Sequence, residues 1–259
     1  MIFNFLIFEK NMIENLMKKE NLENIIGLIG GTSWVSTAEY YRMINEKANE
    51  KLGGLNFARC ILYSLNYGDV NELNNRNELN GVYLLMLDAA KRLHLAGAGC
   101  LVLCANTMHQ YADALEREIP LPLIHIADAT AEAIKSDKFT TVGLLGTRQT
   151  MEMDFYTKKL RDHGIRTIVP EEADREFIEK TIRTELVSGI ITAESNKRFL
   201  EIITNLHNLG AQGVVLGCTE IPLLVRQEQT KVKLYNTLEI HAGAAVDFYL
   251  SNLAKSFNL

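Results

Sequence analysis

Cys218 is the residue whose surroundings in this sequence best suit reactive-thiol chemistry. It follows an apolar run at residues 214–216 and Gly217, and such a run predicts a buried strand that ends just before the thiol. Thr219 is the predicted N-cap of the next helix, and Pro222 suits a first helical turn. A helix N-terminus stabilises a thiolate, so we expect a lowered pKa for Cys218. The alternative is a small buried core residue.

Three more titratable side chains have positions that invite a chemical interpretation. Glu220 follows the thiol by two residues, where it could orient the thiol or carry a proton, or simply stabilise a helix N-terminus by its charge. His109 and His125 could also move protons, although lone histidines more often belong to a core or a helix surface. The cysteines and histidines show neither C-x-x-C nor H-E-x-x-H spacing, so we expect no metal site.

Strands and helices alternate along the chain at lengths typical of parallel βαβ units, which predicts the α/β class. The expected strands are residues 25–29, 58–65, 100–103, 121–126, 142–146, 165–169 and 214–216. The expected helices are residues 36–52, 83–95, 127–135, 150–163, 171–186 and 195–209. Ser36 and Glu39 have the spacing of a capping box, and the polar stretch 71–80 is interpreted as a loop or helix start.

The turn at Gly30 and Gly31 joins a strand to a helix, and such turns can bind a phosphate or carboxylate through backbone N–H groups. The spacing is not the G-x-G-x-x-G of dinucleotide-binding turns. A tight turn needed only for packing is the alternative. Arg76 could hold a substrate carboxylate, but a solvated charge is the simpler interpretation.

An internal duplication relates the two halves of the chain. Residues 97–106 align with residues 210–219 at an offset of 113, and residues 26–30 match 142–146 at an offset of 116. We therefore predict two pseudo-symmetric lobes, each a parallel sheet flanked by helices, with an active-site cleft between them. Because ligands of such sheets bind at the carboxyl ends of strands, the cleft should gather the residues Gly31, Ala105, Thr147 and Cys218.

The predicted domain organisation has three parts. Residues 1–24 form an N-terminal extension, residues 25–121 plus 234–259 form the first lobe, and residues 122–233 form the second lobe. A C-terminal helix is expected to cross back to the first lobe.

Three motifs carry a resemblance to a known family. They are residues 26–31 (IGLIGG), residues 106–109 (NTMH) and residues 217–220 (GCTE). From about residue 25 to its end, the chain resembles the aspartate/glutamate racemases, which are cofactor-independent amino-acid racemases. The resemblance implies two pseudo-symmetric lobes, a homodimer, and neither pyridoxal phosphate nor a metal. It also implies two cysteines that flank the substrate Cα, one on each face.

This chain departs from the family pattern at the first cysteine. The family position is occupied by Ala105, and Cys104 lies one residue early. The internal duplication agrees, because it pairs Cys218 with Ala105. Adjacent residues at a strand tip point to opposite sides, so Cys104 should face away from the cleft. Cys104 could reach the cleft only if the strand tip slipped by one residue, and such a slip would also turn Asn106 and Thr107 away from the cleft.

The resemblance implies the remaining site residues. Cys218 is the implied acid/base thiol, with Glu220 as a possible helper. The implied substrate-binding residues are Asn66, Asn106, Thr107, Thr147, Thr150 and Thr219. We find no equivalent of the arginine and lysine with which some aspartate racemases hold the side-chain carboxylate.

The implied activity is that of an isomerase: racemisation or epimerisation of an amino acid of the aspartate/glutamate class. With a single thiol, three hypotheses stay open. They are a racemase whose second face is served by water, substrate or another side chain; a one-base isomerase or decarboxylase; and a non-catalytic amino-acid-binding protein. A phosphate- or nucleotide-binding module that uses the Gly30-Gly31 turn is a hypothesis of another class.

The composition argues against several other classes of protein. Of 259 residues, 47% are hydrophobic and 23% charged, which is typical of a globular protein. A net charge of −5 argues against a nucleic-acid partner. No apolar run reaches the roughly eighteen residues of a membrane span. The apolar start lacks a basic region, so we expect no signal peptide, and the scattered cysteines favour a cytoplasmic protein with reduced thiols.

Overall fold

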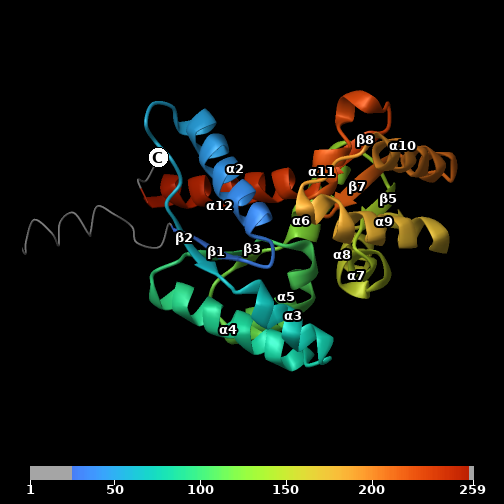
Figure 1. The fold of residues 1–259 in the computed structure, drawn as a ribbon. Coiled ribbons are helices and arrows are strands. Elements are labelled where there is room, and N and C mark those ends of the chain that lie inside the picture. Colours follow the sequence, from blue (N-terminus) through green and yellow to red (C-terminus); the bar gives the residue numbers. More distant parts are fainter. Residues whose placement is uncertain (1–24, 257–259) are drawn as a thin grey trace, which may run out of the picture.

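The chain forms two lobes, each built on a four-stranded parallel sheet, in a computed structural model that describes residues 25–256 (Figure 1). This architecture confirms the predicted α/β class with two lobes. The expected extension at residues 1–24 lies outside the described residues. Within residues 25–256, no helix is both long enough and apolar enough to cross a membrane.

The first sheet has the strand order β2-β1-β3-β4. Its parallel strands are β1 (Ile26–Gly30), β2 (Cys60–Ser64), β3 (Cys100–Leu103) and β4 (Leu123–Ile124). The central strands β1 and β3 are buried along their whole length, which explains why their sequences are apolar without alternation.

The second sheet repeats this arrangement with the order β6-β5-β7-β8. Its parallel strands are β5 (Thr141–Gly146), β6 (Arg166–Ile168), β7 (Gly213–Gly217) and β8 (Lys233–Asn236). β5 therefore corresponds to β1 and β7 to β3, so the duplication predicted from the sequence is confirmed as two sheets of equal topology.

Helices cover both faces of the first sheet (Figure 1). Helices α2 (Trp34–Leu52) and α12 (Thr237–Ser256) cover one face, where Tyr40 and Ala242 are fully buried. Hence the C-terminal helix returns to the first lobe, as predicted. The other face is covered by α3 (Tyr67–Asn75), α4 (Leu79–Leu95), the 3-10 segment η1 (Asn106–Tyr111) and α5 (Ala112–Glu118).

The second lobe has one large apolar core around its sheet, which includes the fully buried Leu144, Phe199 and Val215. The elements around this sheet are α6 (Ile126–Ser136), α7 (Arg148–Glu152), α8 (Asp154–Asp162), α9 (Glu172–Thr184), η2 (Leu186–Ser188), α10 (Ala193–Asn208), α11 (Ile221–Leu224) and η3 (Gln227–Gln229).

Two short strands pair with a different sheet from the one expected. β4 falls in residues expected in the second lobe but pairs with β3. β8, where no strand was expected, falls largely in residues expected in the first lobe but pairs with β7. The reason is that the chain leaves each lobe only after completing its fourth strand. We therefore propose that the lobes divide after Ile124 and after Asn236 rather than at 121/122 and 233/234.

Helix boundaries differ from expectation at two places. Ser33, not Ser36, is the N-cap of α2, because the Ser33 hydroxyl accepts a hydrogen bond from the Ser36 N–H at 3.2 Å. The helix expected over 150–163 is interrupted at Met153, whose extended backbone separates α7 from α8.

Buried polar groups hold the chain where it crosses from the first lobe to the second, at residues 124–126. His241 of α12 donates to the carbonyl of Ile124 at 2.6 Å and accepts from the Tyr40 hydroxyl at 2.7 Å. His109 accepts a hydrogen bond from the N–H of Ile126 at 3.2 Å. The rings of His109 and His125 lie 4.8 Å apart, and those of His109 and His241 5.3 Å apart. These contacts favour neutral imidazoles. A ring nitrogen that accepts a hydrogen bond carries no proton, and two charged rings at this distance would repel each other.

Because of the histidine cluster, we expect the protein to become less stable as the pH falls. Burial lowers the pKa of His125 and of His241 to about 4, and burial also lowers the pKa of His109. The unfolded chain binds these protons near pH 6.5. As the pH falls from about 6.5 to about 4, the free energy of unfolding should therefore drop, by up to about 1.4 kcal/mol per pH unit for each group. Urea unfolding across this range measures the slope.

A His125→Asn variant measures how much His125 contributes to this pH dependence of the free energy of unfolding. His125 caps α6 by accepting from the Ala127 N–H at 3.1 Å, and asparagine can cap in the same way without titrating. The slope should fall by about 1.4 kcal/mol per pH unit. The exposed His94→Asn control should leave it unchanged. An unaltered slope in His125→Asn would show that this ring does not resist protonation in the folded protein.

Candidate active site

The turn after β7 carries the thiol that the sequence singles out. Cys218 follows Gly217 and is buried, with 7% of its surface exposed. Its Sγ donates a hydrogen bond to Oε2 of Glu220 at 3.0 Å, and the hydroxyl of Thr219 donates to the same oxygen at 2.7 Å. Glu220, rather than the predicted Thr219, is the N-cap residue of helix α11, so the hydroxyl of Thr219 is used on the carboxylate and not on the helix end.

The Glu220 carboxylate also joins the two lobes. Ser33, the N-cap of α2 in the first lobe, donates through its hydroxyl to Oε1 of Glu220 at 3.1 Å. Glu220 is itself buried. A buried carboxylate that accepts three hydrogen bonds is held in one orientation, so Oε2 stays beside the sulfur of Cys218.

The environment of Cys218 raises its pKa well above the ordinary value of a thiol. Burial is the largest cause, followed by the negative charge of Glu220 and its hydrogen bond to the thiol. The predicted lowering by a helix N-terminus is therefore wrong. Helix α11 has only four residues, whereas the carboxylate lies 3.0 Å from the sulfur. Near neutral pH, Cys218 is a protonated thiol and suits a proton donor.

Turns after four strands line one cleft between the lobes, with a volume of about 470 Å³. The carboxyl ends of parallel strands share one edge of a sheet, and here the two edges face each other. The lining includes Gly31 to Ser33 after β1, Ala105 to Thr107 after β3, Thr147 and Thr150 after β5, and Gly217 to Glu220 after β7. The structure thus brings Gly31, Ala105, Thr147 and Cys218 together, as the duplication predicts.

Ala105 faces this cleft, and Cys104 does not. Cys104 is 1% exposed and packs in the core beneath α2 and α12, near Tyr40. Its backbone N–H donates to the carbonyl of Ile29 at 2.9 Å, which continues the ladder of the sheet without a slip. Burial raises the pKa of the Cys104 thiol as well. The prediction that Cys104 faces away from the cleft is confirmed.

Asn106 presents an unpartnered acceptor at the cleft. Its side chain is 5% exposed, and its Nδ2 donates to the hydroxyl of Thr237 at 3.2 Å. That hydroxyl donates in turn to the carbonyl of Leu216 at 2.8 Å. The Oδ1 atom of Asn106 has no hydrogen-bond partner among the described residues. Buried acceptors are nearly always satisfied, so a donor such as a ligand ammonium would suit this position.

The threonines and Asn66 have different surroundings. The hydroxyls of Thr147 and Thr150 lie 3.1 Å apart, and both residues line the cleft, as does Thr107. Asn66 instead caps helix α3, where its side chain donates to Asp69 at 2.8 Å, and it is not among the cleft-lining residues. Of the site residues that the family resemblance implies, the structure therefore gathers all except Asn66 at the cleft.

The geometry around Gly31 supports the packing interpretation of its turn. The N–H of Gly31 donates to the Thr37 hydroxyl at 2.9 Å, so this donor is already used within the protein. Gly31 has φ +94°, and a Cβ there would lie 2.0 Å from the carbonyl oxygen of Leu65. Glycine is required for this close approach. His109 and His125 belong to the buried cluster described above and do not line the cleft.

Two polar groups of the cleft were not singled out from the sequence. One is Arg183 of α9 with its partner Glu179, and the other is a row of asparagines on α3. The stretch 71–80 was expected to be a loop or helix start, which hid the helical spacing of Asn71, Asn74 and Asn75. That spacing of three and four residues was the available signal.

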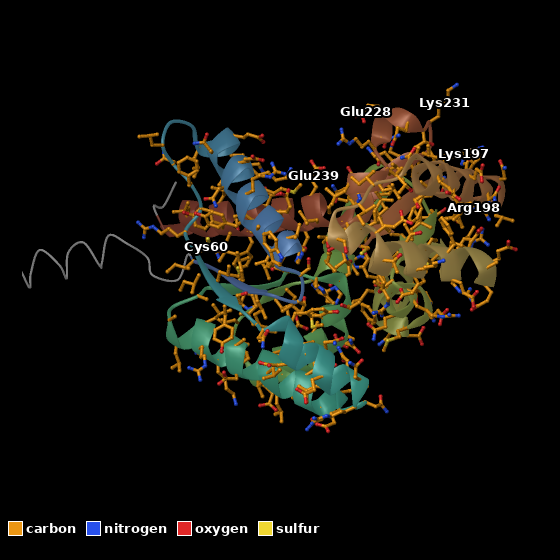
Figure 2. All side chains as sticks on the ribbon, in the orientation of Figure 1. Cys60, Lys197, Arg198, Glu228, Lys231 and Glu239 are labelled. Carbon is orange, nitrogen blue, oxygen red and sulfur yellow. The ribbon has the colours of Figure 1, made fainter. Side chains whose placement is uncertain are left out.

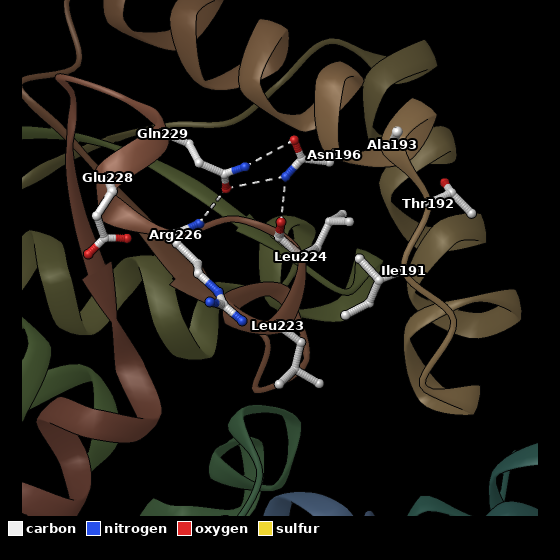
Figure 3. Close-up of a pocket in the computed structure, with 9 residues that line it drawn as sticks. All are labelled: Ile191, Thr192, Ala193, Asn196, Leu223, Leu224, Arg226, Glu228 and Gln229. Carbon is white, nitrogen blue, oxygen red and sulfur yellow. Dashed lines mark hydrogen bonds between the residues drawn. The ribbon is translucent and has the colours of Figure 1, made fainter.

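A second cavity, of about 550 Å³, lies on the second lobe and is shown in Figure 3. Its polar side chains mostly bond one another: Asn196 and Gln229 are joined by two hydrogen bonds of 3.2 and 3.3 Å. Asn196 also donates to the carbonyl of Leu224, the last residue of α11 (Figure 3). These contacts fix the helix that follows Cys218, and the cavity has no thiol of its own.

Residues 25–256 hold neither a metal-ligating cluster nor a disulfide bond. No group of three or more histidine, cysteine or acidic side chains is placed to hold a metal ion in this part of the chain. All four cysteines are free thiols. Cys60 lies on the edge strand β2, in the first lobe and outside the cleft (Figure 2).

The model of the Asp/Glu/hydantoin racemase family matches residues 29–245. The chain therefore belongs to this family, whose members act on small amino-acid or related substrates.

Solved structures agree with this family assignment. A candidate Asp/Glu racemase from Yersinia pestis is 45% identical, with a TM-score of 0.84 over 87% of this chain and 99% of that one. An aspartate racemase homologue from Pyrococcus horikoshii OT3 is 33% identical, with a TM-score of 0.79 over 88% of this chain and 99% of that one. Among curated sequences, the glutamate racemase of Hydrogenobaculum sp. (strain Y04AAS1) is 26% identical over 60% of this chain, and the match spans 58% of that relative.

Alkylation of Cys218 tests the electrostatics of the site. Because the Glu220 charge raises the pKa of the thiol, a Glu220→Gln variant should contain more thiolate at a given pH. Iodoacetamide should then label Cys218 several-fold faster at about pH 8 than in the wild type, as followed by mass spectrometry. Cys60 serves as the internal control and should keep its rate. Slower or unchanged labelling of Cys218 in the variant would contradict the role assigned to Glu220.

Proposed function

We propose that this protein is a cofactor-independent amino-acid racemase or epimerase that uses Cys218 as its acid/base thiol. One observation carries the proposal: a buried thiol is hydrogen-bonded to a fixed carboxylate at the carboxyl end of a strand, inside a cleft between two lobes. Family membership supports racemase chemistry. The proposal requires neither pyridoxal phosphate nor a metal.

The proposed substrate position follows from the polar groups around the thiol. The unpartnered Oδ1 of Asn106 would accept a hydrogen bond from the substrate ammonium. The hydroxyls of Thr107, Thr147, Thr150 and Thr219 would surround the carboxylate and stabilise the charge that develops when the α-proton leaves. Asn66, held as the cap of α3, would act at most by positioning that helix.

The Cys218–Glu220 pair supplies a route for the proton. When the thiol gives its proton to Oε2 of Glu220, the resulting thiolate can take the α-proton of a substrate. In the reverse direction, the protonated thiol returns a proton to the same face of Cα. Because its pKa is raised, the thiol is protonated near neutral pH, so the proton for this second step is present.

Among the described residues, the first-lobe side of the cleft presents no comparable thiol–carboxylate pair. Ala105 carries no titratable atom, and Cys104 is buried in the core. In the proposed racemase, water or the substrate itself therefore serves that face. A one-base isomerase or decarboxylase is the second candidate, and the single thiol favours it. An amino-acid-binding protein would not need the thiol–carboxylate contact, so we rank it lower.

We further propose a homodimer in the cytoplasm. The family resemblance supports the dimer, and four free thiols support a reducing compartment. Light scattering of the purified protein measures its mass in solution. We expect the mass of two chains, and the mass of one chain would contradict the dimer.

Loss of the thiol should abolish turnover. A Cys218→Ser variant should exchange the α-proton of an amino-acid substrate at least about 100-fold more slowly in D₂O, because a positioned acid/base group contributes about 10²- to 10⁴-fold. Proton NMR follows the exchange. Cys60→Ser is the matched control and should retain activity, since Cys60 lies outside the cleft. Equal exchange by Cys218→Ser and wild type would refute the proposal.

Restoring a thiol on the first lobe should accelerate inversion. In an Ala105→Cys variant, both faces of Cα would have a thiol, so racemisation measured by chiral chromatography should rise at least about tenfold. An Ala105→Ser variant is similar in size but has a far weaker acid, and it should show no such gain. If the serine variant matched the cysteine variant, the missing thiol would not be what limits inversion.

A further inference from the structure

One wall of the cleft is a row of neutral hydrogen-bonding side chains. Tyr67, Asn71, Asn74 and Asn75 line it from helix α3. Positions separated by three, four, seven and eight residues share one face of a helix, so this face is continuous. Asparagine side chains offer both an amide donor and a carbonyl acceptor.

The charged residues of α3 are engaged outside this row. Glu72 forms an ion pair with Arg76 one turn later, and Asp69 accepts a hydrogen bond from Asn66 at 2.8 Å. None of these four residues lines the cleft. The helix therefore presents an uncharged polar face to a ligand.

The facing wall carries one cation, and a carboxylate compensates it. Arg183 of α9 is the single basic side chain among the described residues that line the cleft. Its guanidinium is paired with Glu179, which raises the pKa of Arg183. The other oxygen of Glu179 accepts from the backbone N–H of Arg148 at 2.8 Å, and the side chain is 18% exposed. Glu179 is thereby fixed beside the cation.

The cleft as a whole is unfavourable for a second carboxylate on the ligand. Glu220 lines the cleft and Glu179 is paired with Arg183, so two carboxylates accompany one guanidinium. The Glu179 charge also acts on Cys218, because it contributes to the raised pKa of that thiol. Other basic residues such as Lys197, Arg198 and Lys231 lie on the far side of the second lobe (Figure 2).

We propose that the cleft selects amino acids with an uncharged, hydrogen-bonding side chain, an amide or a hydroxyl, over aspartate and glutamate. This inference rests on the proposed function, because it names the substrate class of the same site. A side-chain amide can exchange donor and acceptor pairs with the asparagines of α3. A side-chain carboxylate would lie near two negative charges, and the one guanidinium among the described residues that line the cleft already has its charge balanced by Glu179.

Nearly isosteric substrates test the preference. The pairs are L-glutamine with L-glutamate and L-asparagine with L-aspartate, and the readout is kcat/KM for α-proton exchange in D₂O. At least one amide should exceed its acid by about tenfold or more, since a site that hydrogen-bonds a side-chain amide leaves its own polar groups unpaired against the acid. A preference for the acid in both pairs would overturn the inference while leaving the proposed function intact.

A Glu179→Gln variant should shift the selection. It releases Arg183 from its carboxylate but keeps an oxygen for the N–H of Arg148. The kcat/KM ratio of glutamate to glutamine should therefore rise about tenfold. A double variant, Glu179→Gln with Arg183→Gln, should lose that gain. An unchanged ratio in the single variant would contradict the compensated role of Arg183.

Binding separates the two proposals from each other. Calorimetric titration of the wild-type protein with the same four amino acids reports side-chain preference without turnover. Tighter binding of an amide, with no exchange of any substrate, would overturn the racemase proposal and support the selection. Tighter binding of both acids, or no binding of any of the four, would overturn the selection.

Discussion

The two crossings of the chain between the lobes are the constraint on which the site depends. At the first crossing, His241 and His109 bond the backbone of Ile124 and Ile126, and at the second, Thr237 joins Asn106 to Leu216. These buried contacts keep the carboxyl ends of the two sheets face to face. Each lobe alone would present its strand tips to solvent, and separating the lobes would break the buried hydrogen bonds of His109 to Ile126 and of Thr237 to Leu216.

The same arrangement brings chemistry from both lobes to one carboxylate. Glu220 belongs to the second lobe, yet one of its oxygens accepts from Ser33 of the first lobe while the other accepts from Cys218. The thiol is therefore held as a proton donor by burial and by a nearby negative charge. Ala105 offers nothing of the kind from the first lobe. The proposed chemistry is asymmetric although the fold that carries it is nearly symmetric.

Much of this fold could be predicted from the sequence, because its signals are local. Buried parallel strands appear as uninterrupted apolar runs, and the repeat of residues 97–106 at 210–219 predicts equal topology in the two lobes. That the side chain of Cys104 points away from the cleft follows from the alternation of side chains along a strand. Features that depend on burial and on the packing of the folded chain were missed or wrong. The pKa of Cys218 is set by burial and by Glu220, and the pairing of β4 and β8 depends on which sheet edge each short strand meets.

The distribution of deuterium early in the reaction tests the proposed one-thiol chemistry most directly. Each enantiomer of a substrate is incubated separately in D₂O, and deuterium at Cα is measured in the recovered starting material and in the inverted product. If Cys218 alone serves one face, one enantiomer should gain deuterium in the recovered starting material faster than it inverts. Deuterium confined to the inverted product, from both enantiomers, would show a second acid/base group opposite Cys218 and contradict this account.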